Sequence, residues 1–199
     1  MIDEGYTKYS VNWQRAEPLP SARIEALDRC RRRLWRAGLV GHDEVHDVGY
    51  GNVSVRDVDL GGFVISGTQT GDIQATGPRH YSLVTDYSIE GNRVSCRGPV
   101  QASSEALTHA AIYELSPGIG AVVHVHSEPL WESLKGELPT TGEDVPYGTP
   151  EMAREFQRLY RETDFRTDGI AVMAGHDDGL IAYGHDVEQA TRRIMQLFD

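Results

Sequence analysis

Apolar and polar positions alternate along the chain with two different periods, which predict short strands and amphipathic helices. Apolar residues recur at helical spacing over residues 21–37, 103–115, 149–161 and 186–198. Short apolar or alternating runs predict strands over residues 53–56, 63–66, 81–89, 93–95, 121–127, 169–173 and 180–183. Because a Glu-Gly-Asn turn joins two of these strands and helices separate others, the pattern predicts an α/β fold with a largely antiparallel sheet.

The pattern contains neither an internal repeat nor a linker, so residues 21–199 are predicted to form one domain. The first 20 residues end in Glu-Pro-Leu-Pro, and we expect residues 1–20 to be a loosely ordered N-terminal arm. No apolar run approaches the ~20 residues that cross a bilayer, and the polar N-terminus does not resemble a secretory signal. Two cysteines favour a reducing compartment, so we expect a cytoplasmic protein without a membrane partner.

Charge narrows the choice of partners. The chain carries 30 acidic and 19 basic residues, a formal net charge of −11, which argues against a nucleic-acid partner. The one basic cluster, Arg29 with residues 31–33 and Arg36, falls within a predicted helix. We interpret this cluster as a solvated helix face rather than a phosphate-binding patch. An anionic substrate is compatible with the acidic chain, since backbone N–H groups bind phosphate whatever the net charge.

His124 and His126 form the clearest chemical signal. Alternate residues of a strand project to the same face, so both imidazoles can bind one ion at ~2.0–2.1 Å from each nitrogen. The rest of this strand is apolar. The alternative is a pair of hydrogen-bonded histidines at a strand end. A third ligand is needed, and His176 is the first candidate, with His185 as the competitor. Three histidines with an open position describe a catalytic zinc site.

Glu105 lies at the start of the helix that precedes the His124 strand. Its functional interpretation is a general acid or base beside the metal, and the alternative is a first-turn acid stabilised by the helix dipole. Ser103 and Ser104 offer donors to an anion such as phosphate at the same helix start. Two glycine-rich segments, Gly-Tyr-Gly-Asn-Val-Ser-Val-Arg ending at residue 56 and Ser-Gly-Thr-Gln-Thr-Gly ending at residue 71, have the composition of an anion nest, although turns use the same residues.

The order of these motifs resembles the class II aldolase and adducin family. The resemblance covers residues 22–198. Its motifs are Gly-Asn-Val-Ser-Val-Arg at 51–56, Ser-Gly through Thr-Gly at 66–71, Ser-Ser-Glu at 103–105, His-Val-His at 124–126 and a histidine followed by Gly-Leu-Ile-Ala at 179–182. Tyr147-Gly148-Thr149 also looks like the family. The resemblance implies a three-layer α/β/α sandwich around an antiparallel sheet, usually assembled as a homotetramer.

By the same resemblance, each candidate residue receives a role. His124, His126 and His176 would hold Zn²⁺ or another divalent ion such as Mn²⁺ or Co²⁺, and Glu105 would move the proton. The residues implied in binding the substrate and its phosphate are Asn52, Ser66, Gly67, Thr70, Gly71, Ser103 and Ser104. The implied partner is a small molecule, a phosphorylated sugar.

The chain departs from the family pattern after His176. The family commonly places this histidine directly before glycine, whereas Asp177 and Asp178 intervene here. A local bulge would keep His176 as the ligand, and otherwise Asp178 would replace it. The segment 127–145 is also shorter than in sugar-phosphate aldolases, and the chain stops at Asp199 without an extended tail. These two differences concern the substrate and the reaction.

The sequence therefore predicts a metal-dependent lyase of the aldolase type. It would cleave or form a carbon–carbon bond in a sugar phosphate or related hydroxy-carbonyl compound through a metal-stabilised enediolate. Epimerisation or dehydration on the same scaffold is the alternative, because each begins from the same carbonyl. A non-catalytic, adducin-like interaction module ranks last, since such a module does not need a glutamate with two histidines.

Overall fold

The computed structural model describes residues 6–198. Eight strands of this described part form one sheet in the order β1-β7-β6-β5-β4-β8-β10-β9. Their bounds are β1 Ser10–Arg15, β4 Asn52–Asp57, β5 Gly62–Ser66, β6 Tyr81–Ser88, β7 Arg93–Gly98, β8 Ala121–His126, β9 Ile170–Val172 and β10 Gly179–Gly184. The short strands β2 Gly41–Asp43 and β3 Val48–Tyr50 form a separate hairpin.

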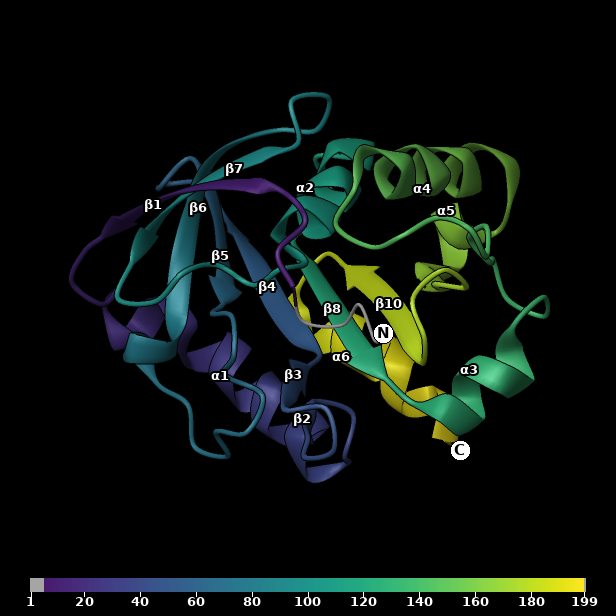
Figure 1. Cartoon of the computed structure of the whole chain (residues 1–199), viewed down its shortest axis with the longest axis horizontal. Helices are drawn as coiled ribbons and strands as arrows, with labels where there is room; N and C mark the ends of the chain where they lie inside the picture. Colours follow the sequence, from purple (N-terminus) through teal and green to yellow (C-terminus); the bar gives the residue numbers. More distant parts are fainter. Residues whose placement is uncertain (1–5, 199) are drawn as a thin grey trace.

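Helices cover both faces of the sheet (Figure 1). The α-helices are α1 Ser21–Arg36, α2 Ala106–Leu115, α3 Glu128–Leu134, α4 Pro150–Glu162, α5 Phe165–Asp168 and α6 Val187–Met195, with 3₁₀ turns at Pro78–His80 and Gln196–Phe198. One hydrophobic cluster joins α2 and α4 to one face, and a second joins α1 and α6 to the other. The domain is therefore a three-layer α/β/α arrangement.

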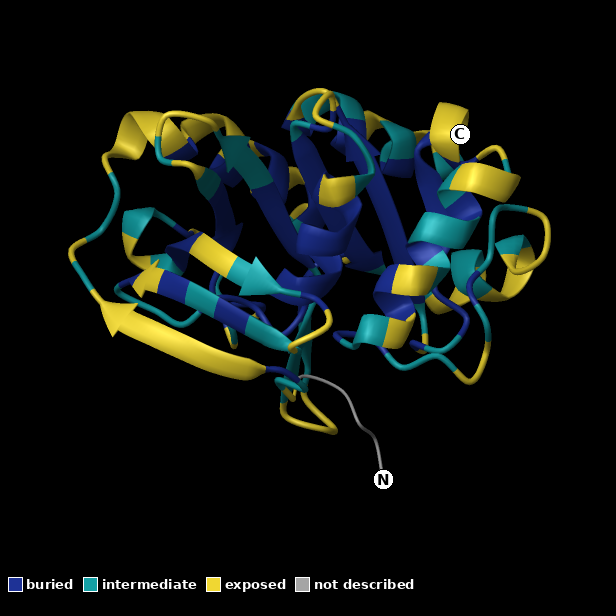
Figure 2. Cartoon of the chain, turned by 90° about the horizontal axis from the view of Figure 1, so that it is seen from above, coloured by how far each residue is buried: buried dark blue, intermediate teal, exposed yellow. Residues whose placement is uncertain are grey.

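Strand β8 shows how the sequence sorts its side chains between the two layers. Val122 packs into the α2 side, whereas Ala121, Val123 and Val125 pack into the α1 side. Successive residues of a strand point to opposite faces, so the period of two predicted from the sequence is confirmed here. Because both faces are covered, the strand is apolar along most of its length. Figure 2 shows these central strands as the buried interior.

Two expectations about the sheet are corrected. The sheet is mixed rather than largely antiparallel, because β1 pairs in parallel with β7, from Ser10 opposite Arg93 to Arg15 opposite Gly98. The loosely ordered arm expected for residues 1–20 is wrong at residues 10–15, which form β1. This strand is exposed along its length at the sheet edge (Figure 2), and the prediction of an arm missed its one sequence signal, the alternation of Val11 and Trp13 with polar residues. Residues 1–5 and 199 lie outside the described residues, and the division into arm and domain stays a prediction.

The longer predicted elements are confirmed with boundaries shifted by a few residues. The main shift concerns the helix expected from residue 103, since α2 begins at Ala106 and leaves Glu105 as its N-cap residue. The short elements β2, β3, α3 and α5 were missed, because three to seven residues carry too little periodicity. Between residues 6 and 198, we find no helix that is both long and apolar enough to cross a membrane.

Phe156 tests the layer formed by α4. Its side chain is fully buried and lies 5.7 Å from the Phe165 ring, measured between centroids. We expect Phe156→Ala to lower the free energy of unfolding by about 3–5 kcal/mol, since it removes buried area and leaves a cavity. Phe198→Ala is the matched control, because Phe198 is 51% exposed, and it should change stability by less than ~0.5 kcal/mol. Urea denaturation measures both, and equal effects would contradict this account of the core.

Candidate active site

Three histidines converge at the end of β8. His124 and His126 project from the strand to one face, and His176 follows β9 in the turn that leads into β10. The Nε2 atom of His126 lies 3.0 Å from Nε2 of His124 and 2.9 Å from Nε2 of His176. The structure therefore brings together the three residues expected to bind a metal. Nitrogen ligands around one tetrahedral ion lie about 3.3 Å apart, close to these separations.

The electrostatics of the three imidazoles suit a cation. Burial lowers the pKa of His124 to about 4. Burial also lowers the pKa of His126 and His176, and the other histidines of the group lower it further. All three rings are therefore neutral near pH 7, the form that ligates metals. Nδ1 of His124 donates a hydrogen bond to the Leu180 carbonyl at 3.0 Å, which directs the Nε2 lone pair toward the other two rings. This donor set fits Zn²⁺ or a similar divalent ion.

A tight turn carries His176 into the group despite the two extra residues. The Gly179 N–H donates to the His176 carbonyl at 3.0 Å, and Asp178 between them has a positive φ of 61°. Asp177 and Asp178 are thus accommodated in the turn. Asp178 does not belong to the cluster of potential ligands found in the described chain, which consists of the three histidines.

His185, the competing candidate, lies elsewhere. Its side chain is exposed and makes a 2.6 Å hydrogen bond with Gln189 and a 3.1 Å ion pair with Asp186. It therefore belongs to the start of α6 rather than to the histidine group.

Glu105 lies beside this group and is buried. Its Oε1 atom is 3.6 Å from Nδ1 of His176, and the two side chains are 3% and 2% exposed. Neither carboxylate oxygen has a hydrogen-bond partner among residues 6–198. Burial raises the pKa of Glu105 to about 7, and the nearby Thr108 hydroxyl and, less strongly, the positive charge of Lys8 oppose the rise. Such a carboxyl can both accept and donate a proton near neutral pH.

A small polar hollow lies next to the histidines, and we call it the anion cradle. Its lining residues come from the two glycine-rich segments and the segment before α2: Gly49, Gly51, Asn52, Gly67, Thr68, Gln69, Thr70, Gly71, Ser103 and Ser104. Asn52 stands opposite His124 in the β4–β8 pairing, so the cradle and the histidines share one end of the sheet. The Asn52 Oδ1 atom is buried without a hydrogen-bond partner in the described part of the chain. A buried polar group of this kind favours a polar ligand.

Six of the seven residues expected to bind the substrate line the cradle, and Ser66 does not. Ser66 is 2% exposed, and its hydroxyl accepts a 3.2 Å hydrogen bond from the Val53 N–H. Its carbonyl accepts a 3.2 Å hydrogen bond from the Ser103 N–H. Ser66 thus links β4 to the segment before α2 through these two hydrogen bonds. Its role in binding the substrate stays a prediction.

Close packing of glycines shapes one side of the cradle. A Cβ atom on Gly71 would lie 1.9 Å from the Gly41 carbonyl oxygen and 2.9 Å from the Gly49 Cα. The loop after β5 can therefore approach the β2–β3 hairpin only with glycine at this position. The sequence marks this site as a turn signal, whereas the structure shows a contact between two backbones.

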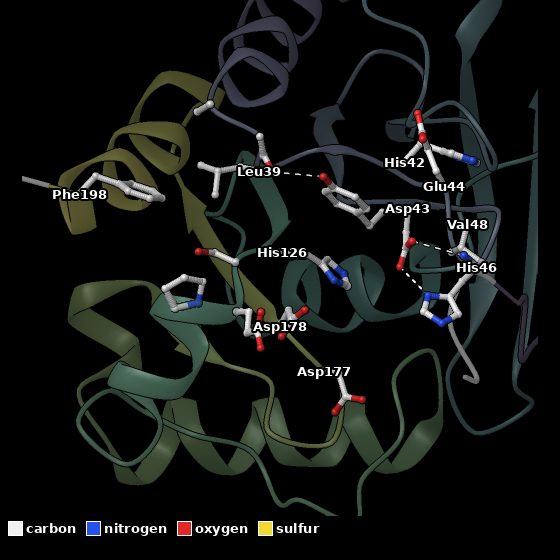
Figure 3. A pocket seen from close by; sticks show the side chains of 16 residues that line it. Leu39, His42, Asp43, Glu44, His46, Val48, His126, Asp177, Asp178 and Phe198 are labelled. Atoms are coloured by element: carbon white, nitrogen blue, oxygen red, sulfur yellow. Dashed lines mark hydrogen bonds and ion pairs between the residues drawn. The ribbon is translucent and has the colours of Figure 1, made fainter. Parts of the chain in front are cut away.

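A larger cavity of about 640 Å³ opens on the other side of His126. Figure 3 shows His126 between the β2–β3 hairpin, which carries His42, Asp43 and His46, and the Asp177–Asp178 turn. Of the three histidines, His126 lines this cavity, so the cavity gives access to one side of the group. The sequence gave no sign of this cavity, because its walls come from segments far apart in the chain.

Three further residues contact the site and were not assigned to it from sequence. The Tyr147 ring lies 4.3 Å from the His176 ring between centroids, and the Lys8 ammonium lies 3.8 Å from the Tyr147 ring centroid. The Tyr9 hydroxyl donates a 2.7 Å hydrogen bond to the Ser103 carbonyl. The Tyr-Gly-Thr motif pointed to Tyr147 only through its family resemblance. Lys8 and Tyr9 lie in the segment that we expected to be an arm, where no pattern marked them.

Gly179 offers a test of the histidine geometry. A Cβ at this position would lie 2.6 Å from Cδ2 of His176 and 3.3 Å from Cε1 of His124. We expect Gly179→Ala to displace both rings and weaken Zn²⁺ binding roughly 10–100-fold, as loss of ligand orientation does elsewhere. Gly77→Ala is the matched control, since nothing lies within 4 Å of a Cβ there. Competition with a zinc chelator measures both affinities, and unchanged binding in Gly179→Ala would contradict the assignment.

Comparison with known proteins identifies the family of the chain. The family model described as Class II Aldolase and Adducin N-terminal domain matches residues 27–198. The chain is 28% identical over 173 residues to a methylthioribulose-1-phosphate dehydratase of Parvibaculum lavamentivorans, which covers 75% of this chain and 78% of that relative.

Solved structures show the same fold. YgbL from Klebsiella pneumoniae superposes with a TM-score of 0.66 at 19% identity, covering 90% of this chain and 86% of that one. An L-fuculose 1-phosphate aldolase superposes with a TM-score of 0.60 at 18% identity, covering 90% and 84%. Since the family model spans nearly all of the described domain, the chain belongs to the class II aldolase and adducin family.

Proposed function

We propose that the chain is a metal-dependent lyase acting on a phosphorylated hydroxy-carbonyl compound. The observation that carries this proposal is the buried carboxylate of Glu105, 3.6 Å from Nδ1 of His176, in a group of three convergent histidines. The anion cradle adjoins this group through the pairing of Asn52 with His124. Residues suited to carrying a proton, holding a cation and holding an anion thus lie at one end of the sheet.

Each part has a chemical task. A divalent ion held by His124, His126 and His176 would supply a Lewis acid that polarises a carbonyl. Glu105 takes or gives the proton, and a nearby cation favours its carboxylate form, the base. Asn52 and the backbone N–H groups of the cradle hold the anionic end of the substrate, and the burial of Glu105 keeps water from competing for the proton.

Two lyase reactions are compatible with this arrangement. Aldol cleavage needs a proton transfer at the hydroxyl group whose carbon–carbon bond breaks, and a group such as Glu105 can perform it. Dehydration needs the same kind of group to protonate a leaving hydroxyl. The name of the Parvibaculum relative favours dehydration as the second candidate. Epimerisation ranks third. A non-catalytic module ranks last, because it would not account for a buried carboxyl beside three histidines, which is costly for the fold.

A panel of ketose phosphates, including methylthioribulose 1-phosphate, tests the function. Zn²⁺-loaded protein is incubated with each compound, and the products are identified by mass spectrometry. Release of an aldehyde indicates aldol cleavage, loss of one water indicates dehydration, and an isomer of unchanged mass indicates epimerisation. The absence of turnover with Zn²⁺, Mn²⁺ and Co²⁺ across the panel would contradict the proposal. The homotetrameric assembly and the cytoplasmic location remain predictions.

Removal of the ligands tests the metal site. The double variant His124→Ala with His126→Ala should retain almost no zinc after gel filtration, compared with about one ion per subunit in the wild type. His185→Ala is the control, because its exposed ring belongs to α6, and it should retain the wild-type content. Elemental analysis measures both. Equal zinc content in the double variant and the wild type would show that His124 and His126 are not the metal ligands.

Glu105→Gln tests the proton carrier. The amide keeps the shape of the side chain but cannot accept the proton, so we expect kcat to fall at least about 100-fold. Metal content and melting temperature should hardly change. Glu114→Gln, an exposed residue of the same helix, should keep wild-type turnover. If Glu105→Gln turned over at the wild-type rate, the residue would be only a buried acid at the helix start.

A further inference from the structure

Side chains on one face of helix α1 donate hydrogen bonds to the loop between β5 and β6. Asp28, Arg31 and Trp35 are spaced by three and four residues, so they project to the same side of the helix. Arg31 donates a hydrogen bond to the Ile73 carbonyl at 2.8 Å and another to the Thr70 carbonyl. Trp35 Nε1 donates to the Gly71 carbonyl at 3.2 Å. Both Thr70 and Gly71 line the anion cradle.

Arg31 corrects the interpretation of the basic cluster as a solvated face. Its neighbours Arg29 and Arg33 are exposed and pair with Glu188, whereas Arg31 is 1% exposed. Desolvation lowers the pKa of Arg31, and the neighbouring Tyr81, Asp28 and Asp72 oppose this shift. Burying a guanidinium is costly unless it is paired and hydrogen-bonded. The loop carbonyls provide that compensation, so this contact is specific rather than incidental.

Asp28 completes the contact on the same helix face. It accepts a hydrogen bond from the Tyr81 hydroxyl at 2.9 Å and another from the Thr76 hydroxyl. Arg31 is attracted to Asp28 electrostatically and lies 3.5 Å from the Thr76 hydroxyl oxygen. The loop is thus tied to α1 at both its cradle end and its distal end. This network lies behind the cradle and makes no contact with the histidine group in the described residues.

The direction of the carbonyls decides what the loop offers to a ligand. In a trans peptide, the carbonyl of one residue and the N–H of the next point in opposite directions. The Thr70 and Gly71 carbonyls point toward α1, so the N–H groups of Gly71 and Asp72 point away from it, and of these two residues Gly71 lines the cradle. A backbone N–H group at the wall of the cradle can donate a hydrogen bond to an anion there. If these carbonyls lost their donors, the peptides could rotate and turn their oxygens toward the ligand.

We infer that Arg31 and Trp35 are positioning residues that orient the Thr70–Asp72 peptides for binding the anionic end of the substrate. This inference rests on the proposed function of the cradle. Arg31 is not among the residues that line the cradle. It acts through the two carbonyls that it holds, and its buried positive charge adds to the favourable potential behind the cradle.

Binding of inorganic phosphate to the full-length, Zn²⁺-loaded protein tests the inference by calorimetry. Arg31→Gln should weaken phosphate binding at least about tenfold, since it removes two buried donors. Arg31→Lys should give an intermediate affinity, because a single ammonium cannot reproduce the planar fork. Arg33→Gln, an exposed arginine of the same helix, is the matched control and should bind as the wild type does. Zinc content should be the same in all four proteins.

Trp35→Phe covers the case in which Arg31→Gln does not fold. It keeps an aromatic ring in place and removes only the donor to Gly71, so phosphate affinity should fall about two- to fivefold. Hydrogen exchange of residues 68–73 should be faster in this variant than in Arg33→Gln. A role limited to stability would lower the melting temperature without changing the phosphate affinity of the folded protein, and that result would overturn the inference.

Asn52→Ala separates this inference from the function on which it rests. If the wild type binds phosphate, Asn52→Ala loses it and both Arg31→Gln and Trp35→Phe keep it, the cradle stands and the positioning role is wrong. If the wild type binds no phosphate, or Asn52→Ala binds it unchanged, the cradle is not an anion site and the positioning role falls with it.

Discussion

The packing of four ionisable side chains, three of them buried, at one end of β8 is the constraint on which the rest of the site depends. Glu105, His124 and His176 are buried between the apolar layers, and His126 is half-buried beside them. Such groups are costly to bury unless they become neutral, pair with each other or bind an ion. The imidazoles respond by losing their charge, and the carboxyl responds with a raised pKa. Neutral nitrogen donors beside a carboxyl with a near-neutral pKa are what a metal-assisted proton transfer requires.

Strand pairing and hydrogen bonds fix the positions of the residues in and around this cluster. Strand pairing sets Asn52 against His124 and Gly179 against His126, so the cradle and the histidines share one register. Behind the cradle, α1 ties the loop through Arg31. Helix α1 therefore has two tasks. Its apolar side chains pack into the core, and its Arg31 and Trp35 side chains hold the loop that lines the cradle.

Much of the fold could be predicted because its elements are amphipathic. The period of two in β8 placed both histidines on one face before any tertiary contact was known. Helical spacing located α1, α2, α4 and α6. The strand β1 was missed because only Val11 and Trp13 carry its alternation, and its parallel pairing with β7 is a long-range contact that no local pattern encodes. The sequence also left the third ligand undecided, since Asp177 and Asp178 allowed either a bulge that keeps His176 in the group or its replacement by Asp178.

The sequence by itself determined the types of residue in the site, their strands and helices, and the family. These follow from local rules, namely side-chain periodicity and the chemistry of each group. Only the tertiary structure decided which polar residues are buried and what they face. Arg31 looks like its exposed neighbours in the sequence, and it is buried only because a loop some 40 residues later folds over it. Contacts between distant segments depend on how whole layers pack, and no local pattern encodes that packing.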